Sequence, residues 1–337
     1  MTWLSSGYFL TASIPDPEGA SSPGGGALPE NPVDRIGWHA TTQASMTVTA
    51  LPGRDRSDAL EGGVIAHYIT RADDPQLPRF YAAYDAAFIL PDEKEDIDGF
   101  RACLALNEGG AYERLSALYG PYREMVILLT DGAHGPVLGA ANFILFAGDG
   151  SDPTVSLSYI FVDAAQRRRG LFGLLMHLIR EEARDAFIWP PGDIPVPLIF
   201  IEMNDPVKMS AADYARDSRH AGLDQVERLK IWERRGARLI DFAYRQPPLS
   251  AAQAAEDNLL IGVLGSGGAD LTACRLLAHM RRFFGVTVLK GRDPASSPIA
   301  AEQLALLDAA CARGERVALT GFDHVYAAAR QVRRDRS

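Results

Sequence analysis

Three consecutive arginines followed by glycines form the part of the chain best suited to chemistry. Arg167-Arg168-Arg169 stands directly before Gly170, and a second glycine, Gly173, follows within one helical turn. Guanidinium groups present forked donors that match phosphate oxygens. Glycine lets a ligand come close to the backbone and permits unusual backbone angles. These residue types in this order predict a binding site for a polyphosphate.

The elements on either side must position this loop. A run of β-forming residues ends at Val162, and an amphipathic helical pattern begins at Leu171, with apolar residues at spacings of three and four. The first turn of a helix has backbone N–H groups without partners, and its dipole favours negative charge. The alternative is a solvated basic turn before an ordinary helix. Its position between a strand and a helix favours the phosphate site.

The segment 162–173 resembles the acyl-CoA loop of the GNAT superfamily of N-acetyltransferases. That pattern is Arg or Gln, two residues, Gly, one residue, then Gly or Ala. Arg167 and Gly170 match it, whereas Phe172 stands in the last position and the glycine is displaced to Gly173. The resemblance implies acetyl-CoA as acyl donor, with its pyrophosphate held by the residues of the loop: Arg167, Arg168, Arg169, Gly170, Leu171, Phe172 and Gly173.

The same resemblance gives roles to residues outside the loop. By position, the backbone of Phe161 and Val162 would hold the thioester carbonyl and the pantetheine arm. Asn204 is a candidate to hydrogen-bond the pantetheine amides, and an ordinary turn at the end of a strand is an equal alternative. The family places an acid for the leaving group on a tyrosine four residues before the glycine of the closing motif. Here that position is Trp232, which has no useful acid, so we consider three substitutes: Tyr159, Tyr214 and Tyr244.

Glu202 is the candidate general base. It is the carboxylate within the apolar stretch 196–203, and burial there would raise its pKa toward neutral pH. The alternative is an ion pair with an arginine of a neighbouring strand, such as Arg238. Both interpretations stay open from the sequence.

An acidic run between two early helical patterns is a candidate for selecting the acceptor. Such a run can attract a cationic amine, or it can be a solvated helix start favoured by the helix dipole. Its members are Asp92, Glu93, Glu95 and Asp96. His67 and His177 are interpreted as structural and surface residues, respectively, and no group of residues has metal-ligand spacing.

Element order over residues 63–248 also resembles the GNAT superfamily. It implies an α/β (α+β) fold in which helices flank a mixed, mostly antiparallel central sheet. The polar stretch 205–225 is expected to be a lid or substrate loop. We expect strands at 63–70, 124–130, 137–146, 159–162, 196–203 and 238–244, and helices within 76–106, after 170 and at 223–235.

Two segments flank this acyltransferase domain. Residues 1–62 are rich in Pro, Gly and Ser and are expected to be a flexible leader, with Met46 as an alternative start. Residues 249–337 form a C-terminal α/β extension, in which 259–264 can complete the sheet. Gly265–Gly268 lacks the spacing of a dinucleotide loop and is interpreted as a turn.

Composition excludes several classes of function. The 337 residues carry a formal net charge of −9, which argues against nucleic-acid binding. No apolar run approaches the ~20 residues of a membrane span. The three cysteines lack metal-ligand spacing and are interpreted as unpaired residues of a reducing compartment, so we expect a cytoplasmic protein.

The sequence therefore predicts an acetyl-CoA-dependent N-acetyltransferase without a metal. It would move an acetyl group directly onto a primary amine of a small molecule or a peptide. The alternative is a catalytically silent acyl-CoA-binding regulatory module, which Trp232 favours.

Overall fold

The computed structural model describes residues 48–51, 56–91, 94–148, 152–192, 194–250 and 253–336. These residues belong to one compact unit, 45–337. Most of the predicted leader, Met46, and Asp92 and Glu93 of the acidic run lie outside the described residues.

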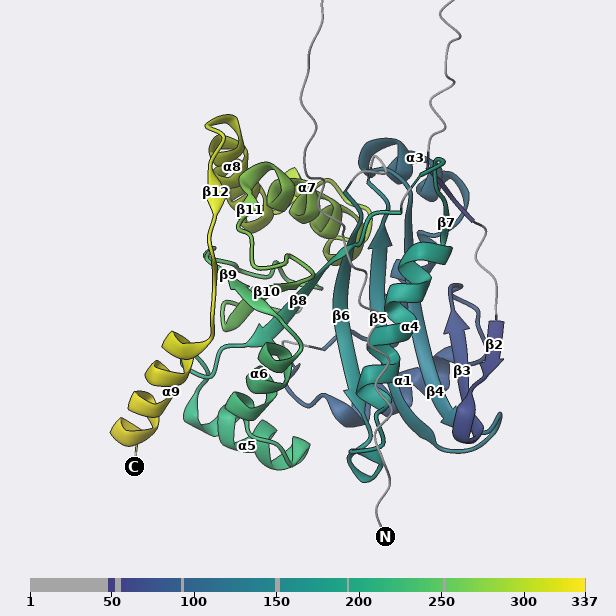
Figure 1. Cartoon of the computed structure of the whole chain (residues 1–337), viewed down its shortest axis with the longest axis horizontal. Helices are drawn as coiled ribbons and strands as arrows, with labels where there is room; N and C mark the ends of the chain where they lie inside the picture. The colour runs from purple at the N-terminus through teal and green to yellow at the C-terminus, as the bar shows by residue number, and fades with distance from the viewer. Residues whose placement is uncertain are drawn as a thin grey trace, which may run out of the picture. The chain divides into compact units, whose positions relative to one another are not determined.

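A nine-stranded sheet forms the centre of the unit, in the order β13-β9-β10-β8-β6-β5-β4-β3-β2 (Figure 1). β6 and β8 pair in parallel, and the other neighbours pair antiparallel. The expected mixed, mostly antiparallel sheet is thus confirmed. The strands are β2 (Arg56–Ala59), β3 (Val64–Ile69), β4 (Tyr122–Asp131), β5 (Val137–Phe146), β6 (Thr154–Val162), β8 (Leu198–Asn204), β9 (Arg238–Ile240), β10 (Leu259–Leu264) and β13 (Leu319–Thr320). Two short pairs lie outside this sheet: β1 (Thr49–Ala50) with β7 (Phe187–Ile188), and β11 (Leu271–Thr272) with β12 (Arg316–Val317).

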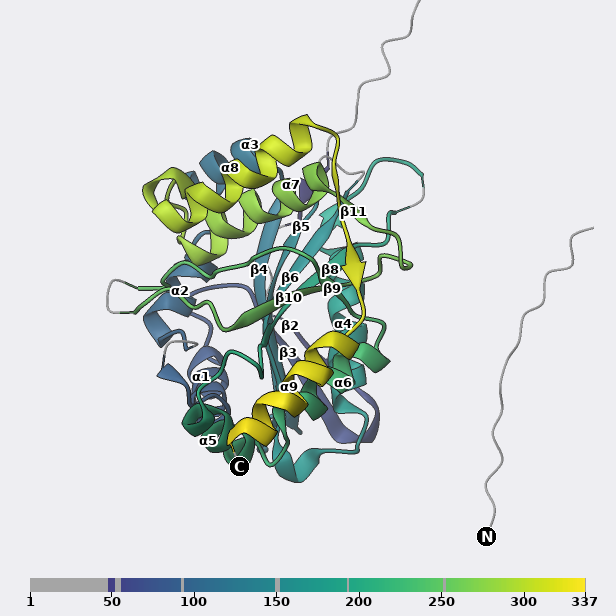
Figure 2. The ribbon, with the colours of Figure 1, turned by 90° about the vertical axis from the view of Figure 1, so that its left-hand side faces the viewer.

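Helices cover both faces of the sheet. Figure 2 shows α1 and α2 on one side and α4 and α6 on the other. The larger helices are α1 (Leu77–Ala87), α2 (Ile97–Ala105), α3 (Gly109–Tyr119), α4 (Leu171–Asp185), α5 (Ala211–Ala221), α6 (Gln225–Arg234), α7 (Ala273–Phe283), α8 (Pro298–Ala312) and α9 (Asp323–Arg336). Short helical turns are η1 (Glu61–Gly63), η3 (Ala164–Gln166), η4 (Phe284–Val288, a π-helix) and η5 (Pro294–Ser296).

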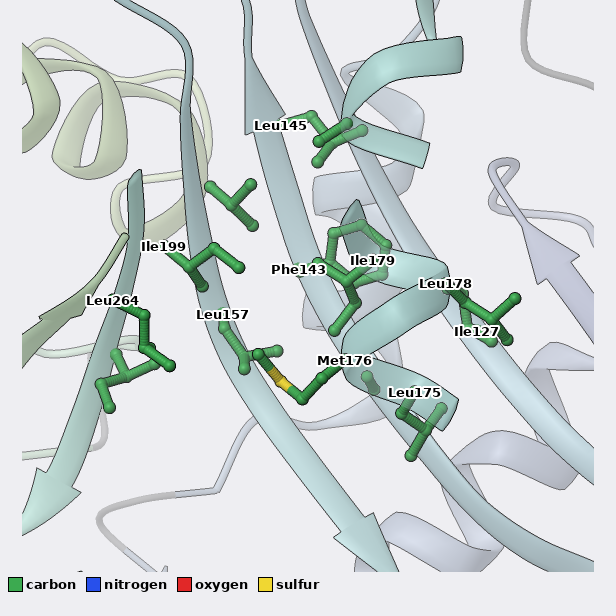
Figure 3. Close-up of a cluster of buried hydrophobic side chains, with 14 of the residues drawn as sticks. Ile127, Phe143, Leu145, Leu157, Leu175, Met176, Leu178, Ile179, Ile199 and Leu264 are labelled. Atoms are coloured by element: carbon green, nitrogen blue, oxygen red, sulfur yellow. The ribbon is translucent and has the colours of Figure 1, made fainter. Parts of the chain in front are cut away.

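Alternation along the strands explains the two faces. Successive residues of a strand point to opposite sides of a sheet. Met125 and Ile127 of β4 therefore pack in the cluster that contains the apolar side of α4, whereas Val126 and Leu128 pack with α1 and α2. In Figure 3 the side chains of α4, among them Met176, meet those of the strands that it covers. The helical spacing read from the sequence thus buries α4 and fixes its N-terminus beside β6.

Three parts of the chain differ from expectation. Residues 56–62, expected to be leader, instead form β2 and η1, and β2 pairs with β3. The stretch 205–225 is largely the helix α5 rather than a loop, because Ser210 caps its N-terminus and Gly222 ends it in the left-handed region. The helices α3 and α9 had no counterpart in the prediction. As expected, residues 259–264 join the sheet, between β8 and β9, and 265–268 form a turn.

The prediction of unpaired cysteines was wrong for two of the three. Cys274, at the start of α7, and Cys311, near the end of α8, form a disulfide, with Cα atoms 4.5 Å apart. Their separation of 37 residues gave no sign of pairing, because contact depends on how α7 and α8 pack. Cys103 is free and buried. In the described parts of the chain, no helix has both the length and the apolar character needed to cross a membrane.

Candidate functional site

Two neighbouring strands, β6 and β8, separate part-way along the sheet. Their parallel pairing runs from Thr154–Leu198 to Leu157–Ile201 and then stops, although both strands continue. At the same point the pairing of β6 with β5 shifts by one residue, which leaves Ser158 as an extra residue in β6. Such a bulge bends a strand and increases its local twist. One backbone edge of β6 beyond Ser158 is therefore paired with β5, and its other edge faces the gap toward β8.

The basic loop lies at the end of this separated strand. η3 follows β6, and the next residues turn through the left-handed region at Arg168 (φ 66°) and Gly170 (φ 79°) before α4 begins. Gly170 is the N-cap residue of α4, and no side chain caps this N-terminus. The N–H groups of the first turn are therefore left for a ligand, as the helix dipole also favours. Glycine suits position 170, since a left-handed backbone is strained for other residues.

A cavity of about 840 Å³ extends from this loop into the gap between β6 and β8. We call it the donor cavity, after the acyl donor that the sequence predicts. Nearly all the predicted site residues line it, although they come from three elements (β6, α4 and β8) and one loop. Those that line it are Phe161, Val162, Arg167, Arg168, Gly170, Leu171, Phe172, Gly173, Glu202 and Asn204. Arg169 does not line it, because its guanidinium donates to the side chain of Gln166. Arg167 lines the cavity but also donates to the carbonyl of Ala221 at 2.6 Å, which ties the loop to the end of α5.

The strand order, the divergence of two parallel strands and the loop before α4 together decide the fold. The chain has the fold of the GNAT superfamily. In this chain β10, a strand from the C-terminal segment, lies between β8 and β9 in the central sheet. From β3 to β9 the expected elements occur in the order that the resemblance implied, with α3, β7 and α5 in addition.

Comparisons with known proteins give distant likenesses to solved GNAT structures. One is a protein from Bacteroides thetaiotaomicron described as a GNAT-family acetyltransferase, with 13% identity and a TM-score of 0.41 over 68% of this chain and 99% of that one. Another is the ribosomal-protein-S18-alanine N-acetyltransferase of Escherichia coli, with 17% identity and a TM-score of 0.32 over 64% and 98%. A GNAT acetyltransferase from Staphylococcus aureus Mu50 has 13% identity and a TM-score of 0.33 over 59% and 97%. No family model and no curated protein matches the sequence.

Glu202 lies on β8 just beyond the last residue paired with β6. Its Oε1 accepts a hydrogen bond from the hydroxyl of Tyr244, which follows β9. Burial raises the pKa of Glu202 to about 7, and the hydrogen bond from Tyr244 opposes that rise. The alternative partner, Arg238, donates instead to the carbonyl of Leu319 at 3.4 Å. A carboxyl group with a pKa near 7 can take up or release a proton at neutral pH.

Trp232 lines the donor cavity on α6. Its ring packs edge-to-face on Phe172, with centroids 5.2 Å apart. The guanidinium of Arg235 also lies over the ring of Phe172. The two residues that depart from the family pattern therefore contact each other. An indole at this position adds apolar surface to the cavity wall and no acid.

The three tyrosines considered as substitutes have different surroundings. Tyr214 donates to Asp224 at 2.7 Å and does not line the donor cavity. Tyr159 lines it, and burial raises its pKa well above the usual value. Tyr244 is buried beside Glu202, and burial together with that carboxylate also raises its pKa well above the usual value. Tyr244 is thus the substitute that contacts the candidate base.

The histidines fit the roles expected of them. His67 is buried in β3 between Ser57 and Thr130, at 2.8 and 2.9 Å. His177 is exposed on α4 and lies 3.3 Å from Glu181. Among the described residues, no group of three or more His, Cys, Asp or Glu is placed to hold a metal ion.

Two features of the site were not found from the sequence. Tyr244 was one of three substitutes and was not linked to Glu202, because the two residues lie 42 positions apart. Glu124 was read only as the start of a strand, yet it is buried and lines a second cavity next to the first. A carboxylate at the start of an otherwise apolar strand is the signal that could have identified it.

Proposed function

We propose that the chain is an acetyl-CoA-dependent N-acetyltransferase, which moves an acetyl group directly onto a primary amine. The observation that carries the proposal is the donor cavity, which joins an uncapped helix N-terminus and a basic loop to a half-buried carboxyl of near-neutral pKa. The residues present fit the donor: N–H groups for a pyrophosphate, a free strand edge for an amide-containing arm, and a base at the far end.

Different residues would bind the pyrophosphate and the pantetheine arm of the donor. The N–H groups of Leu171, Phe172 and Gly173 would bind the pyrophosphate together with Arg168, whose side chain makes no ion pair among the described residues. The N–H of Phe172 serves as well as that of glycine, so the departure at this position leaves the anion site intact. The free edge of β6 at Phe161 and Val162 would bind the pantetheine arm, and Asn204 faces the same cavity.

Glu202 would act as the base. Acetyl-CoA supplies the acetyl group as a thioester. Glu202 accepts the proton that the amine nitrogen loses as its N–C bond forms and the C–S bond breaks; the leaving thiolate takes up a proton from water, and Glu202 returns its proton to the solvent. Tyr244 positions the Glu202 carboxylate and stabilises its ionised form through its hydroxyl.

The alternative is a silent module that binds acyl-CoA without transfer. Trp232 favours it, because the indole stands where the family has a catalytic tyrosine. The pairing of Tyr244 with Glu202 favours the enzyme. A cytoplasmic location stays a prediction, and the disulfide removes the cysteine argument for it.

A thiol-release assay over a panel of amines separates the two functions. We expect CoA to bind in calorimetry and free thiol to appear with at least one amine. Glu202→Gln should lower turnover by about a hundredfold or more while CoA affinity changes less than about twofold, since loss of a base costs about 10²–10⁴. Tight CoA binding without turnover on any amine would support the silent module. No CoA binding would refute both.

A further inference from the structure

A second cavity, of about 110 Å³, lies against the gap between β6 and β8. It shares part of its lining with the donor cavity, so the two meet at the candidate base. The shared residues are Phe88, Ser158, Tyr159, Glu202 and Asn204. Anything bound in the second cavity would therefore reach the place where the acetyl group is expected.

A row of four polar residues, one from each of four adjacent strands, lines this cavity. They are Glu124 on β4, Asn142 on β5, Ser158 on β6 and Glu202 on β8. Glu124 lies two residues before Val126 on β4, so both point to the face that packs with α1 and α2. Asn142 is paired with Val126 and therefore points to the same face. The polar row thus crosses the sheet on the face that is opposite to α4.

Glu124 is the unusual member of the row. It is only 2% exposed, its Oε1 accepts from Asn142 Nδ2 at 2.6 Å, and its Oε2 has no hydrogen-bond partner among the described residues. Asn107 holds the backbone of Glu124 from both sides, at 2.9 Å and 2.7 Å, so the strand cannot easily move the carboxyl away. A buried acceptor without a partner is costly and calls for an explanation.

Two further polar atoms of residues that line the cavity are also buried without a hydrogen-bond partner in the described part of the chain. The hydroxyl oxygens of Ser158 and Thr287 are buried and have no partner among the described residues. Thr287 lies in η4, and a π-helical turn of this kind is frequent at functional sites. Three unsatisfied polar atoms facing one small cavity indicate a polar ligand.

The charges of the cavity indicate the sign of that ligand. Glu95 lines it too, but Lys290 neutralises Glu95 across 2.7 Å. Among the described residues, Glu124 and Glu202 have no cation beside them. Burial accordingly raises the pKa of Glu124 to about 8, with a smaller contribution from the charge of Glu95. A cationic ligand would restore the ionised form.

Much of the remaining wall is apolar and comes from the C-terminal segment, although Gln246 and Asn204 also line the cavity. Leu249, Leu259, Phe283 and Val288 face the cavity, opposite Phe88 and Phe100 of the N-terminal helical region. The apolar part of the wall suits the methylene groups of a ligand.

We propose that this cavity binds the acceptor, and that the acceptor is a short aliphatic diamine or polyamine. This inference rests on the proposed function. One nitrogen would lie at Glu202 and be acetylated, and the other, as an ammonium group, would lie at Glu124. The volume of about 110 Å³ holds only a few methylene-sized groups.

Isothermal calorimetry with two probes tests the proposal. Putrescine and n-pentylamine have equal numbers of non-hydrogen atoms, but only putrescine has a second ammonium group. With saturating CoA present, we expect putrescine to bind about ten- to a hundredfold more tightly, the size of a charged hydrogen bond in a buried site. Near pH 7 in buffers of different ionisation enthalpy, putrescine binding should release about one more proton than pentylamine binding, because Glu124 ionises.

Glu124→Gln should remove both the preference and the additional proton, while its affinity for pentylamine and for CoA stays within about twofold. Glu182→Gln is the control, since Glu182 is a buried carboxyl of α4, on the opposite face of the sheet, and is paired with Arg56 at 2.6 Å. It should keep the preference for putrescine.

Equal binding of the two amines to the unaltered protein would overturn the proposal, even if Glu124→Gln does not fold. A preference that survives in Glu124→Gln would overturn it as well. If CoA itself does not bind, the proposed function fails, and the same two titrations on the free protein still decide whether the cavity prefers a diamine.

Discussion

Tyr244→Phe tests how the candidate base is tuned. The hydroxyl of Tyr244 donates to Glu202 and opposes the effect of burial, which alone raises the pKa of that carboxyl. Removal of the donor destabilises the ionised carboxylate and leaves the protonated form unaffected. The pKa of Glu202 must therefore rise above its value of about 7.

The size of the rise follows from the hydrogen bond. A hydrogen bond to a charged group contributes about 1.5–3 kcal/mol, and one pKa unit corresponds to about 1.4 kcal/mol. The rise is thus about one to two units. Near pH 7 the ionised fraction of Glu202 would fall from about one half to between about one tenth and one hundredth, so kcat/KM would fall by about 5- to 50-fold.

The assay is a profile of kcat/KM against pH by thiol release. For Tyr244→Phe the rise in rate with pH should move upward by about one to two units, and activity near pH 9 should return to within about twofold of the unaltered protein. Tyr326→Phe is the matched control, because Tyr326 donates to Glu233 at 2.9 Å on the outer helices α9 and α6. It should leave the profile unchanged.

Two results would refute this reasoning. A loss of the same factor at every pH would mean that Tyr244 delivers a proton to the leaving group rather than tuning Glu202. An unchanged profile would mean that Glu202 is not the base.

Three other predictions concern binding and stability. Arg168→Ala should weaken CoA binding by about tenfold, whereas Arg169→Ala should change it by less than about twofold, because Arg169 donates to Gln166. Calorimetry compares the two variants, and equal losses of affinity would contradict the proposed anion site. Glu124→Gln should unfold at a higher temperature than the unaltered protein above about pH 5, and the difference should grow up to about pH 8. The pKa of Glu124 is raised to about 8 in the folded protein, so the unaltered protein loses stability as the pH rises toward 8, whereas glutamine does not titrate. A constant difference across this range would mean that Glu124 is not buried as an acid. Replacement of Cys274 and Cys311 by serine should cost about 4 kcal/mol of unfolding free energy under oxidising conditions, from the loop of 37 residues, and nothing in the presence of reductant; equal stability of both proteins under both conditions would mean that the bond does not form.

Much of the fold could be predicted because its signals are local. The apolar spacing after Leu171 predicted α4, and the strands expected at 124–130 and 137–146 correspond to β4 and β5, so these predictions are confirmed. The stretch 205–225 was predicted wrongly as a loop, because its low hydrophobicity concealed a solvent-facing helix whose signals are caps rather than an apolar stripe. α9 was missed for a similar reason, since only Val325, Tyr326 and Ala329 of its described side chains are buried.

The sequence by itself determined the donor loop. The atoms that would bind an anion there belong to consecutive residues from Arg167 to Gly173, and a strand followed by a basic turn and a helix brings them together without help from the rest of the chain. Residue order is sufficient because backbone N–H groups of one helical turn always point the same way.

Only the tertiary structure decided the surroundings of Glu202 and the second cavity. Glu124, Asn142, Ser158 and Glu202 meet because four strands lie side by side in one register, and a slip of one residue would turn any of these side chains to the other face. Tyr244, which follows β9, contacts Glu202, and Lys290, which follows η4, contacts Glu95. Such contacts depend on packing between distant segments, which no local pattern in the sequence specifies.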